Sequence, residues 1–277
     1  PRSTLFPYTT LFRSGFAHSG RVAGRHYGSD DSYGEEKAGK QGMKAYLKAQ
    51  AEKMGVPMTD AQADAFCAYH DRLTAANREM NLTRVGEDAQ EAVDRNYLDS
   101  LTILPFLDGV STLIDVGTGA GFPGLVLKLL DPTIRLTLLD SLGKRITWLT
   151  QLCQELALPD VVLIKGRAEE LSHRKTHREA YDVAVSRALA SMPVLSELCL
   201  PYVKPGGLFL AMKSNKTDEE IAAAEDIVHT LGGEKPFVMD YLIPGTEVYH
   251  RVVTVFKSRP TPGTYPRKWA KMKETKI

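Results

Sequence analysis

Ser111-Thr-Leu-Ile-Asp-Val-Gly-Thr-Gly-Ala-Gly-Phe-Pro-Gly124 is the stretch that decides the fold of this 277-residue chain. Its first half is aliphatic and β-branched, as in a buried strand, and carries the acid Asp115 near its end. The second half contains four glycines, Gly117, Gly119, Gly121 and Gly124. Residues without a Cβ allow a chain to turn sharply after a strand and to bring its backbone close to a ligand. The stretch therefore predicts a strand, a cofactor-binding turn and a helix.

Two cofactors that contain a nucleoside match this turn. Gly119-Ala-Gly-Phe-Pro-Gly124 satisfies the dinucleotide fingerprint G-x-G-x-x-G, and Asp140 follows about 20 residues on, where a ribose-binding acid is expected. A carboxylate at Asp115, however, repels a diphosphate and suits a cationic ligand. Pro123 also lacks a backbone N–H that a phosphate would use. S-adenosylmethionine, which carries a sulfonium and no phosphate, therefore fits the turn better than NAD.

The composition limits the class of protein. The 43% hydrophobic content is sufficient for one large or two small globular domains, and the net charge of +1 gives no global sign of nucleic-acid binding. No apolar run approaches the roughly 18 residues that span a membrane. Cys67, Cys153 and Cys199 are widely spaced, without a C-x-x-C motif or a Cys/His cluster. We therefore expect a soluble protein of the reducing cytoplasm with no metal site.

The N-terminal part of the chain divides into two segments. Residues 1–42 show no sustained apolar period and predict a disordered or non-native leader, with Met43 as the expected start. From 43 to 107 the apolar residues recur at helical spacing and predict three helices. Thr59-Asp-Ala-Gln62 fits a capping box at the start of the second, and Pro105 is expected to close the third.

Residues 108–258 predict an α/β domain with a parallel sheet covered on both faces, because strands alternate with helices there. The predicted strands cover residues 112–116, 134–139, 161–165, 181–185, 207–213, 236–243 and 248–257. The predicted helices lie near residues 122–130, 144–156, 188–200 and 217–231. Only Pro244-Gly-Thr separates the last two strands, so we expect an antiparallel hairpin at one edge of a mostly parallel, seven-stranded sheet.

Residues 259–277 form a basic, proline-containing tail. Residues 257–277 hold seven Lys or Arg against one Glu. A solvated tail and a contact with a phosphate backbone both remain open.

The carboxyl ends of the predicted strands supply the candidate site residues, because ligands of open parallel sheets bind beyond these ends. The residues concerned are Asp115, Gly117, Asp140, Ser141, Ala168, Glu169, Ser186, Arg187 and Lys213. Asp140 is suited to accept bonds from two ribose hydroxyls, although it can also cap the next helix. Glu169 either faces an adenine or is solvated. Arg187 directly follows a buried strand, a costly position for a cation without a partner, which favours a role in the site.

The motifs that the chain lacks limit which atom could receive a methyl group. Amino-group methyltransferases commonly carry an Asp/Asn-Pro-Pro-aromatic motif after the fourth strand, where this chain reads Ser186-Arg-Ala-Leu-Ala-Ser191. Cytosine C5 methylation needs a Pro-Cys nucleophile, which is also missing. A ring nitrogen with a lone pair needs neither, because alignment in a dry pocket supplies most of the catalysis.

Several ordered motifs together resemble one family. They are Leu-Ile-Asp115-Val-Gly-Thr-Gly-Ala-Gly-Phe-Pro-Gly124, Leu-Leu-Asp140-Ser-Leu-Gly-Lys-Arg145, Ser186-Arg-Ala188, Asn-Leu-Thr83 and Leu98-Asp-Ser100. This set resembles the small-subunit ribosomal RNA methyltransferase G family, also called glucose-inhibited division protein B. The resemblance covers about Met43 to Lys268. Beyond Lys268 the chain departs from the family into Trp-Ala-Lys-Met-Lys-Glu, and residues 1–42 have no counterpart.

The resemblance implies a class I S-adenosylmethionine-dependent, Rossmann-like fold with an N-terminal helical extension. It also implies methylation of N7 of one guanine, with 16S ribosomal RNA or the small ribosomal subunit as partner. The cofactor contacts carried over by position are Gly117, Phe122, Asp140, Ser141, Ala168, Glu169 and Arg187. The analysis of the turn adds Asp115 and Gly119 to these candidates. Arg187 and Lys213 are the candidates for orienting the base or stabilising developing charge, and no general base is assigned.

Two other classes of function stay open. An NAD-dependent oxidoreductase would share the glycine turn, and a non-catalytic RNA-binding relative would keep the basic segments, including 165–178, but lose the cofactor. We expect the methyltransferase to act as a cytoplasmic monomer without contact to a membrane.

Overall fold

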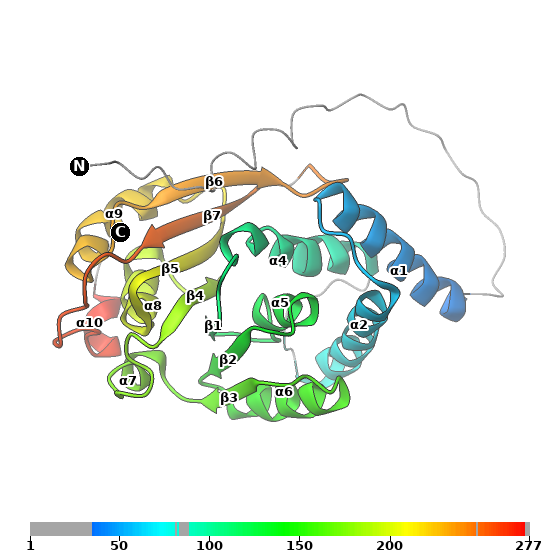
Figure 1. Cartoon of the computed structure of the whole chain (residues 1–277), viewed down its shortest axis with the longest axis horizontal. Helices are drawn as coiled ribbons and strands as arrows, with labels where there is room; N and C mark the ends of the chain where they lie inside the picture. The colour runs from blue at the N-terminus through cyan, green and yellow to red at the C-terminus, as the bar shows by residue number, and fades with distance from the viewer. Residues whose placement is uncertain (1–34, 81, 83–88, 248, 275–277) are drawn as a thin grey trace.

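The computed structural model describes residues 35–80, 82, 89–247 and 249–274, which form one sheet with helices on both sides (Figure 1). Its strands are β1 (Thr112–Val116), β2 (Arg135–Asp140), β3 (Val161–Lys165), β4 (Tyr181–Arg187), β5 (Val203–Ser214), β6 (Phe237–Leu242) and β7 (Tyr249–Phe256). Their order is β3-β2-β1-β4-β5-β7-β6. Strand β7 runs antiparallel to both neighbours, and the remaining pairs are parallel. The predicted fold class and its edge hairpin are confirmed.

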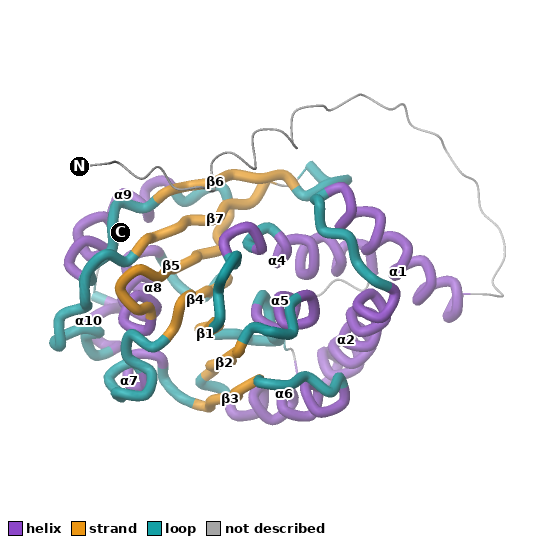
Figure 2. Tube along the Cα trace, in the orientation of Figure 1, coloured by secondary structure: helices purple, strands orange, loops and turns teal. Residues whose placement is uncertain are grey.

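Two groups of helices cover the two faces of the sheet (Figure 2). Helices α5 (Gly124–Leu130) and α6 (Gly143–Glu155) pack on one face, and α7 (Ala168–Leu171), α8 (Met192–Cys199) and α9 (Asp218–Thr230) pack on the other. Neighbouring strand residues point to opposite faces, so Leu113 joins the first core and Ile114 the second. Because both faces are covered, the strands are almost continuously apolar.

The N-terminal region is helical and shares the core of the first face. It contains α1 (Glu35–Lys53), α2 (Asp60–Met80), α3 (Ala89–Ala92), the π-helical segment Val93–Leu98, α4 (Asp99–Leu101) and a 3₁₀ turn, Leu104–Phe106. Phe66 of α2 and Tyr97 of the π-helical segment belong to the same core as Leu113 of β1. The capping box is confirmed: the Gln62 N–H donates to Thr59 Oγ1 (3.2 Å), and the Thr59 N–H donates to Gln62 Oε1 (3.0 Å).

Several boundaries differ from the predictions; strand β5, for example, begins at Val203 rather than at residue 207. Helix α1 begins at Glu35, so residues 35–42 are helical rather than unstructured. These residues include good helix formers such as Glu, Lys and Ala, but almost none of them is apolar. This part of the helix therefore has no apolar stripe that a periodicity search could detect. The third helical region ends before Pro105, which lies in the 3₁₀ turn. Helix α8 begins at Met192, after a loop in which Ala188 has a φ of +52°.

Some predicted features lie outside the described residues. These are the leader up to residue 34, Asn81 and Thr83 of the Asn-Leu-Thr motif, residue 248 of the last predicted strand, and residues 275–277 of the tail.

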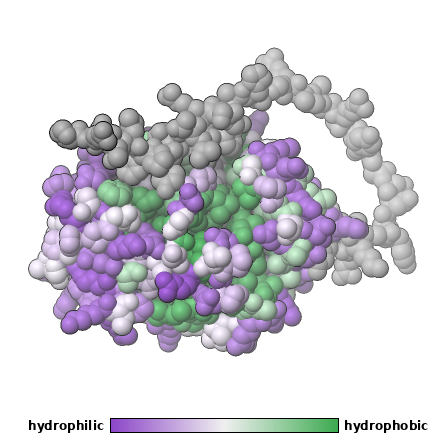
Figure 3. Space-filling model, viewed as in Figure 1, coloured by the Kyte–Doolittle hydropathy of each residue, from purple (hydrophilic) through white to green (hydrophobic). Residues whose placement is uncertain are grey.

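The surface is mostly polar at the margins of the face in Figure 3, with apolar residues gathered near its middle. Among the described residues, exposed large apolar side chains include Leu142, which follows β2, and Leu189, which follows β4. No helix in the described part of the chain combines the length and the apolar character needed to cross a bilayer.

The C-terminal segment folds back onto the domain, so of the two alternatives left open for the tail, a freely solvated segment does not describe residues 258–274. Helix α10 (Trp269–Lys273) buries Met272 in the second core. Arg178 donates to the carbonyl oxygens of Thr261, Pro262 and Tyr265 at 2.9–3.0 Å. Sequence composition could not predict this packing, because partners of the tail such as Arg178 and Glu197 lie 70 or more residues away along the chain.

A buried ion pair fixes the end of this segment. Arg267 donates from Nη2 to Glu197 Oε2 (2.7 Å) and from Nε to Glu197 Oε1 (3.0 Å). The Glu197 side chain is 1% exposed, whereas that of Arg267 is 35% exposed. Removing Arg267 would leave the Glu197 carboxylate buried without its cation, whereas removing Glu197 would leave a guanidinium that water can reach. The two changes should therefore lower the free energy of unfolding by different amounts.

This asymmetry gives a stability prediction. We expect Arg267→Ala to lower the free energy of unfolding by about 3–5 kcal/mol, because it leaves the Glu197 carboxylate buried without its cation. Glu197→Gln should cost less, because the remaining guanidinium is partly solvated. Urea titration of both variants measures this difference, and an equal or reversed loss would contradict it.

Candidate functional site

The glycine turn between β1 and α5 is held in shape by Asp115. Its Oδ2 accepts bonds from Thr118 Oγ1 (2.8 Å) and from the Gly124 N–H (2.9 Å), so one carboxylate oxygen joins both ends of the turn. A Cβ at position 124 would lie 2.8 Å from this oxygen. Gly117 and Gly119 have φ values of +74° and +61°, which side chains disfavour. The turn therefore depends on its glycines and on Asp115 together.

The environment of Asp115 opposes its negative charge. The residue is fully buried, and among the described residues its Oδ1 has no hydrogen-bond partner. Burial raises the pKa of Asp115 to about 7, against the lowering effect of the bonds from Gly124 and Thr118. A carboxyl group in this state is mostly protonated below about pH 7, and a nearby positive charge would favour its ionised form.

Asp140 connects the end of β2 to the turn. Its Oδ1 accepts a bond from the Leu142 N–H (2.8 Å), and its Oδ2 accepts bonds from the Gly119 N–H (3.0 Å) and from Arg145 Nη1 (3.1 Å). The side chain is 4% exposed, whereas the neighbouring Ser141 is exposed. Because three donors already use this carboxylate, a hydroxyl of a ligand would compete with Arg145 for it.

The residues that follow β3 are fixed by neighbours from several elements. Arg167 pairs with the buried Glu169 at 2.9 Å, and Tyr202 donates to the carbonyl oxygen of Ala168 (2.7 Å). The guanidinium of Arg167 also lies 5.0 Å from the ring centroid of Trp269 in the C-terminal segment. Glu169 is therefore paired rather than solvated.

Arg187 has the partner that its position at the end of β4 demanded. Its Nη1 donates to the Arg95 carbonyl (3.0 Å) and to Asp99 Oδ2 (3.2 Å), and its Nη2 donates to Asn96 Oδ1 (3.0 Å). The guanidinium carbon lies 4.8 Å from the ring centroid of Phe122. The partner carboxylate, Asp99, was missed as a functional residue, although Leu98-Asp-Ser100 was one of the motifs of the resemblance.

Phe122 was expected to contact the cofactor and Lys213 to orient the base, but both side chains are engaged within the protein. The Phe122 side chain is buried and stacks on Tyr69 with ring centroids 5.3 Å apart, so this ring belongs to the core. The Lys213 side chain is 9% exposed, and its ammonium donates to Glu220 Oε2 (2.6 Å) and to the Ala190 carbonyl (2.9 Å). Lys213 therefore stabilises the loop after β4, and its ammonium is not available to a substrate in this arrangement.

The loop after β4 covers the glycine turn. A Cβ at Gly117 would lie 2.7 Å from the Leu189 side chain, which is 41% exposed. Ser186, at the end of β4, is buried and donates from Oγ to the Val116 carbonyl (2.7 Å). The structure thus brings the ends of β1, β2 and β4 together, as the topology predicted.

The cysteines lie outside this site. Cys67, Cys153 and Cys199 are buried in α2, α6 and α8. Burial raises the pKa of the Cys153 thiol to about 11, and it also raises that of Cys199. These thiols are not activated as nucleophiles.

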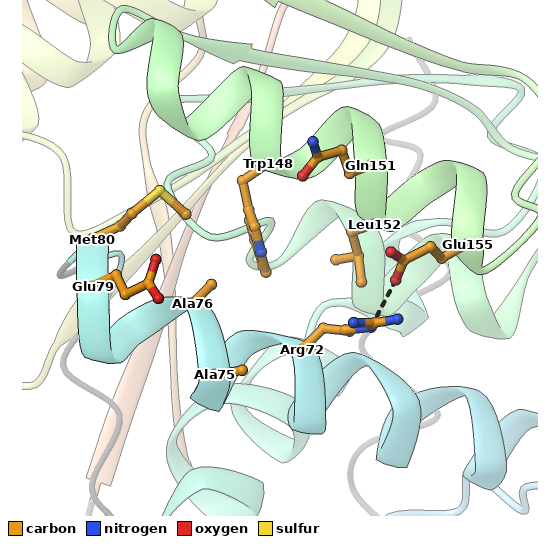
Figure 4. A pocket seen from close by; sticks show the side chains of 9 residues that line it. All are labelled: Arg72, Ala75, Ala76, Glu79, Met80, Trp148, Gln151, Leu152 and Glu155. Carbon is orange, nitrogen blue, oxygen red and sulfur yellow. Dashed lines mark ion pairs between the residues drawn. The ribbon is translucent and has the colours of Figure 1, made fainter.

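A separate cavity of about 290 Å³ lies between α2 and α6 (Figure 4). It is lined by Arg72, Ala75, Ala76, Glu79, Met80, Trp148, Gln151, Leu152 and Glu155. Arg72 and Glu155 form an ion pair (2.8 Å) across it. The predicted site residues do not line this cavity, so it is distinct from the strand-end site.

Known proteins resemble the chain in sequence and in fold. The family model described as "GidB: rRNA small subunit methyltransferase G" matches residues 62–245, more than half of the chain. A relative from Alkaliphilus metalliredigens named ribosomal RNA small subunit methyltransferase G is 42% identical over 81% of this chain and 95% of its own length. One of the same name from Acetivibrio thermocellus is 43% identical over 80% of this chain and 91% of its own length.

Solved structures share the fold at low sequence identity. An O-methyltransferase from Bacillus cereus, solved in complex with S-adenosylhomocysteine, matches 78% of this chain and 100% of its own (TM-score 0.50, 14% identity). The S-adenosylmethionine-dependent methyltransferase SibL matches 80% of this chain and 77% of its own (TM-score 0.50, 16% identity). These matches identify the fold as that of class I S-adenosylmethionine-dependent methyltransferases.

The raised pKa of Asp115 predicts a pH dependence of stability. Between about pH 4 and pH 7 the folded chain keeps a proton on Asp115 that the unfolded chain has lost, so this group destabilises the fold as the pH rises. Asp115→Asn does not ionise. From pH 4 to pH 7 its free energy of unfolding should therefore rise relative to the wild type, by up to about 4 kcal/mol.

Urea titration at several pH values measures this difference, with the exposed Asp108→Asn as the control. Parallel pH profiles of the wild type and Asp115→Asn would contradict a raised pKa of Asp115.

Proposed function

Because the chain belongs to the ribosomal RNA small subunit methyltransferase G family, we propose that it transfers a methyl group from S-adenosylmethionine to N7 of a guanine in 16S ribosomal RNA. The observation that carries this proposal is the glycine turn with two carboxylates bonded to its backbone. Asp115 bonds to the Gly124 N–H, and Asp140 bonds to the Gly119 N–H.

The residues at the turn fit S-adenosylmethionine better than a dinucleotide. The Asp115 carboxylate, when ionised, would repel a pyrophosphate bound at the turn, and Pro123 offers a pyrophosphate no N–H. A sulfonium and an amino group, by contrast, would add positive charge near the buried Asp115, whose Oδ1 has no hydrogen-bond partner among the described residues. The space at Gly119 is also open, since the nearest atom to a Cβ built there is 4.0 Å away.

We propose that residues at the carboxyl ends of β1, β2, β3 and β4 bind the cofactor. The backbone at Gly117 and Gly119 would lie against the amino-acid part, and Asp140 with Ser141 would bind the ribose. Ala168 and Glu169 would lie at the adenine. Arg187, with the Phe122 ring behind it, would complete the site on the β4 side, and Asp115 would act from beneath the turn.

When bound, S-adenosylmethionine supplies an electrophilic methyl group on a sulfonium. Guanine N7 has an in-plane lone pair and no proton to lose, so the protein needs no general base for the transfer. What the chain must provide is alignment and exclusion of water. The methylated base is cationic, so Arg187 is suited to orient the base rather than to neutralise it, and its pairing with Asp99 keeps its own charge balanced.

Exposed cations at the same edge provide contacts for RNA phosphates. Lys165 is exposed at the end of β3, and Arg174 and Lys175 are exposed beyond α7. Such contacts fix the position of an RNA without reading its sequence. By contrast, Arg178 and Arg267 already bond within the protein, so we no longer assign them to phosphates. We propose a cytoplasmic monomer that acts on the small subunit or its RNA.

Calorimetric titration tests the cofactor. We expect S-adenosylhomocysteine to bind more tightly than NADH by at least 100-fold. Asp140→Ala should weaken this binding at least 10-fold, because it removes an acceptor for the ribose and the bond to Gly119, whereas Asp108→Ala should bind like the wild type. Thermal melting of both variants controls for folding. Tighter binding of NADH would overturn the proposal in favour of an oxidoreductase.

Transfer of label tests the substrate. We expect tritium from the methyl group of S-adenosylmethionine to enter 16S RNA of small subunits that lack this modification, and Asp140→Ala to reduce the rate at least 100-fold. Cofactor binding without transfer to either subunits or free 16S RNA would point to a non-catalytic RNA-binding protein.

A further inference from the structure

Another buried carboxylate, Asp99, lies at the junction of three parts of the fold. It begins α4, after the π-helical segment Val93–Leu98, and is 3% exposed. Its Oδ1 accepts bonds from the Tyr241 hydroxyl (2.6 Å) and from His250 Nδ1 (2.7 Å), which belong to the edge hairpin of β6 and β7. Its Oδ2 accepts the bond from Arg187 at the end of β4 (3.2 Å).

The π-helical segment surrounds the Arg187 guanidinium with acceptors. The Arg95 carbonyl and Asn96 Oδ1 lie 3.0 Å from its nitrogens, next to the bond from Asp99. Every one of these acceptors comes from residues 95–99. The N-terminal helical region therefore determines where this guanidinium lies, although Arg187 itself belongs to the sheet. Segments of π-helix are frequently found at functional sites.

Asp99 is held in its charged form. Burial alone would raise the pKa of Asp99, but the hydrogen bond from His250 and the positive charge of Arg187 outweigh burial and bring the pKa below its usual value. An ionised Asp99 fixes one side of the Arg187 guanidinium, and the Phe122 ring lies 4.8 Å from the guanidinium carbon. A planar cation held between a carboxylate and an aromatic face has little freedom to rotate.

We propose that Asp99 is a positioning residue of the methyl-transfer site, acting through Arg187. Tyr241 and His250 hold the Asp99 carboxylate, and Asp99 in turn holds Arg187 at Phe122, next to the glycine turn. The inference rests on the proposed function, because that function supplies the cofactor or the base that Arg187 would orient. It adds that the edge hairpin and the N-terminal region determine the geometry of this contact.

A purely structural role for Asp99 would lead to different measurements. It would lower the melting temperature and the fraction of folded protein, but leave the affinity and rate of the folded fraction unchanged. A positioning role changes the affinity for the cofactor or the rate at saturating cofactor, and it depends on the presence of Arg187.

The first experiment is a double-mutant cycle with Asp99→Asn and Arg187→Ala. The amide of Asp99→Asn can still donate to Tyr241 or His250 and accept from Arg187, so the variant removes mainly the charge. We expect kcat/KM for methyl transfer to 16S RNA, with KM and kcat resolved, to fall at least 10-fold. In the Arg187→Ala background the same change should cost less than twofold. Asp94→Asn, from the same helical segment but with its carboxylate bonded to Tyr46, is the matched control and should stay within twofold of the wild type.

The second experiment uses His250, which is 23% exposed and tolerates change more easily if Asp99→Asn fails to fold. His250→Ala removes one donor to Asp99 and should lower kcat/KM at least threefold, and His250→Asn should recover most of this loss, because its amide can donate in place of Nδ1. Melting temperatures are measured for every variant.

The outcomes separate the inference from the function on which it rests. If the wild type binds S-adenosylhomocysteine and methylates RNA, but Asp99→Asn behaves like Asp94→Asn, the inference is wrong and the function stands. Independent effects of Asp99→Asn and Arg187→Ala, or a loss that only follows the melting temperature, also overturn it. A wild-type protein that binds no S-adenosylhomocysteine overturns both.

Discussion

The hydrogen bonds from Thr118 and Gly124 to one oxygen of Asp115 are the constraint on which the site depends. They close the turn between β1 and α5 and bring its backbone to the carboxyl end of the sheet. The second carboxylate, Asp140, bonds to Gly119 from the neighbouring strand, so two buried acids share one short turn. A carboxylate beneath the turn disfavours a diphosphate and suits a cationic cofactor. The cost of burying Asp115 is visible in its raised pKa.

The remainder of the molecule positions the partners of this turn. The N-terminal helices share a core with one face of the sheet and supply the acceptors around Arg187. The C-terminal segment packs on the other face, where Trp269 lies against Arg167, the partner of Glu169. Segments distant in sequence thus meet at the proposed cofactor site, and the positions of its charged groups depend on the whole fold.

Local patterns predicted the parts of the fold that depend on near neighbours. The strands, the glycine turn, the capping box at Thr59 and the edge hairpin follow from periodicity and turn chemistry. Long-range pairing was inaccessible: the need of Arg187 for a partner was clear, but Asp99 lies 88 residues away. The engagement of Lys213 by Glu220 and the burial of Phe122 among aromatic residues likewise depend on tertiary packing. The helix at residues 35–42 was missed because helix propensity without an apolar face leaves no periodic signal.

Mass spectrometry of nucleosides from 16S RNA, after incubation of unmodified small subunits with the protein and S-adenosylmethionine, tests the central claim most directly. The account predicts one new N7-methylguanosine per 16S RNA and none with Asp140→Ala. A methyl group on an exocyclic amine, a ribose or a pyrimidine carbon would contradict it. The chain also lacks the amine-binding motif common in amino-group methyltransferases and the Pro-Cys nucleophile of cytosine C5 methylation.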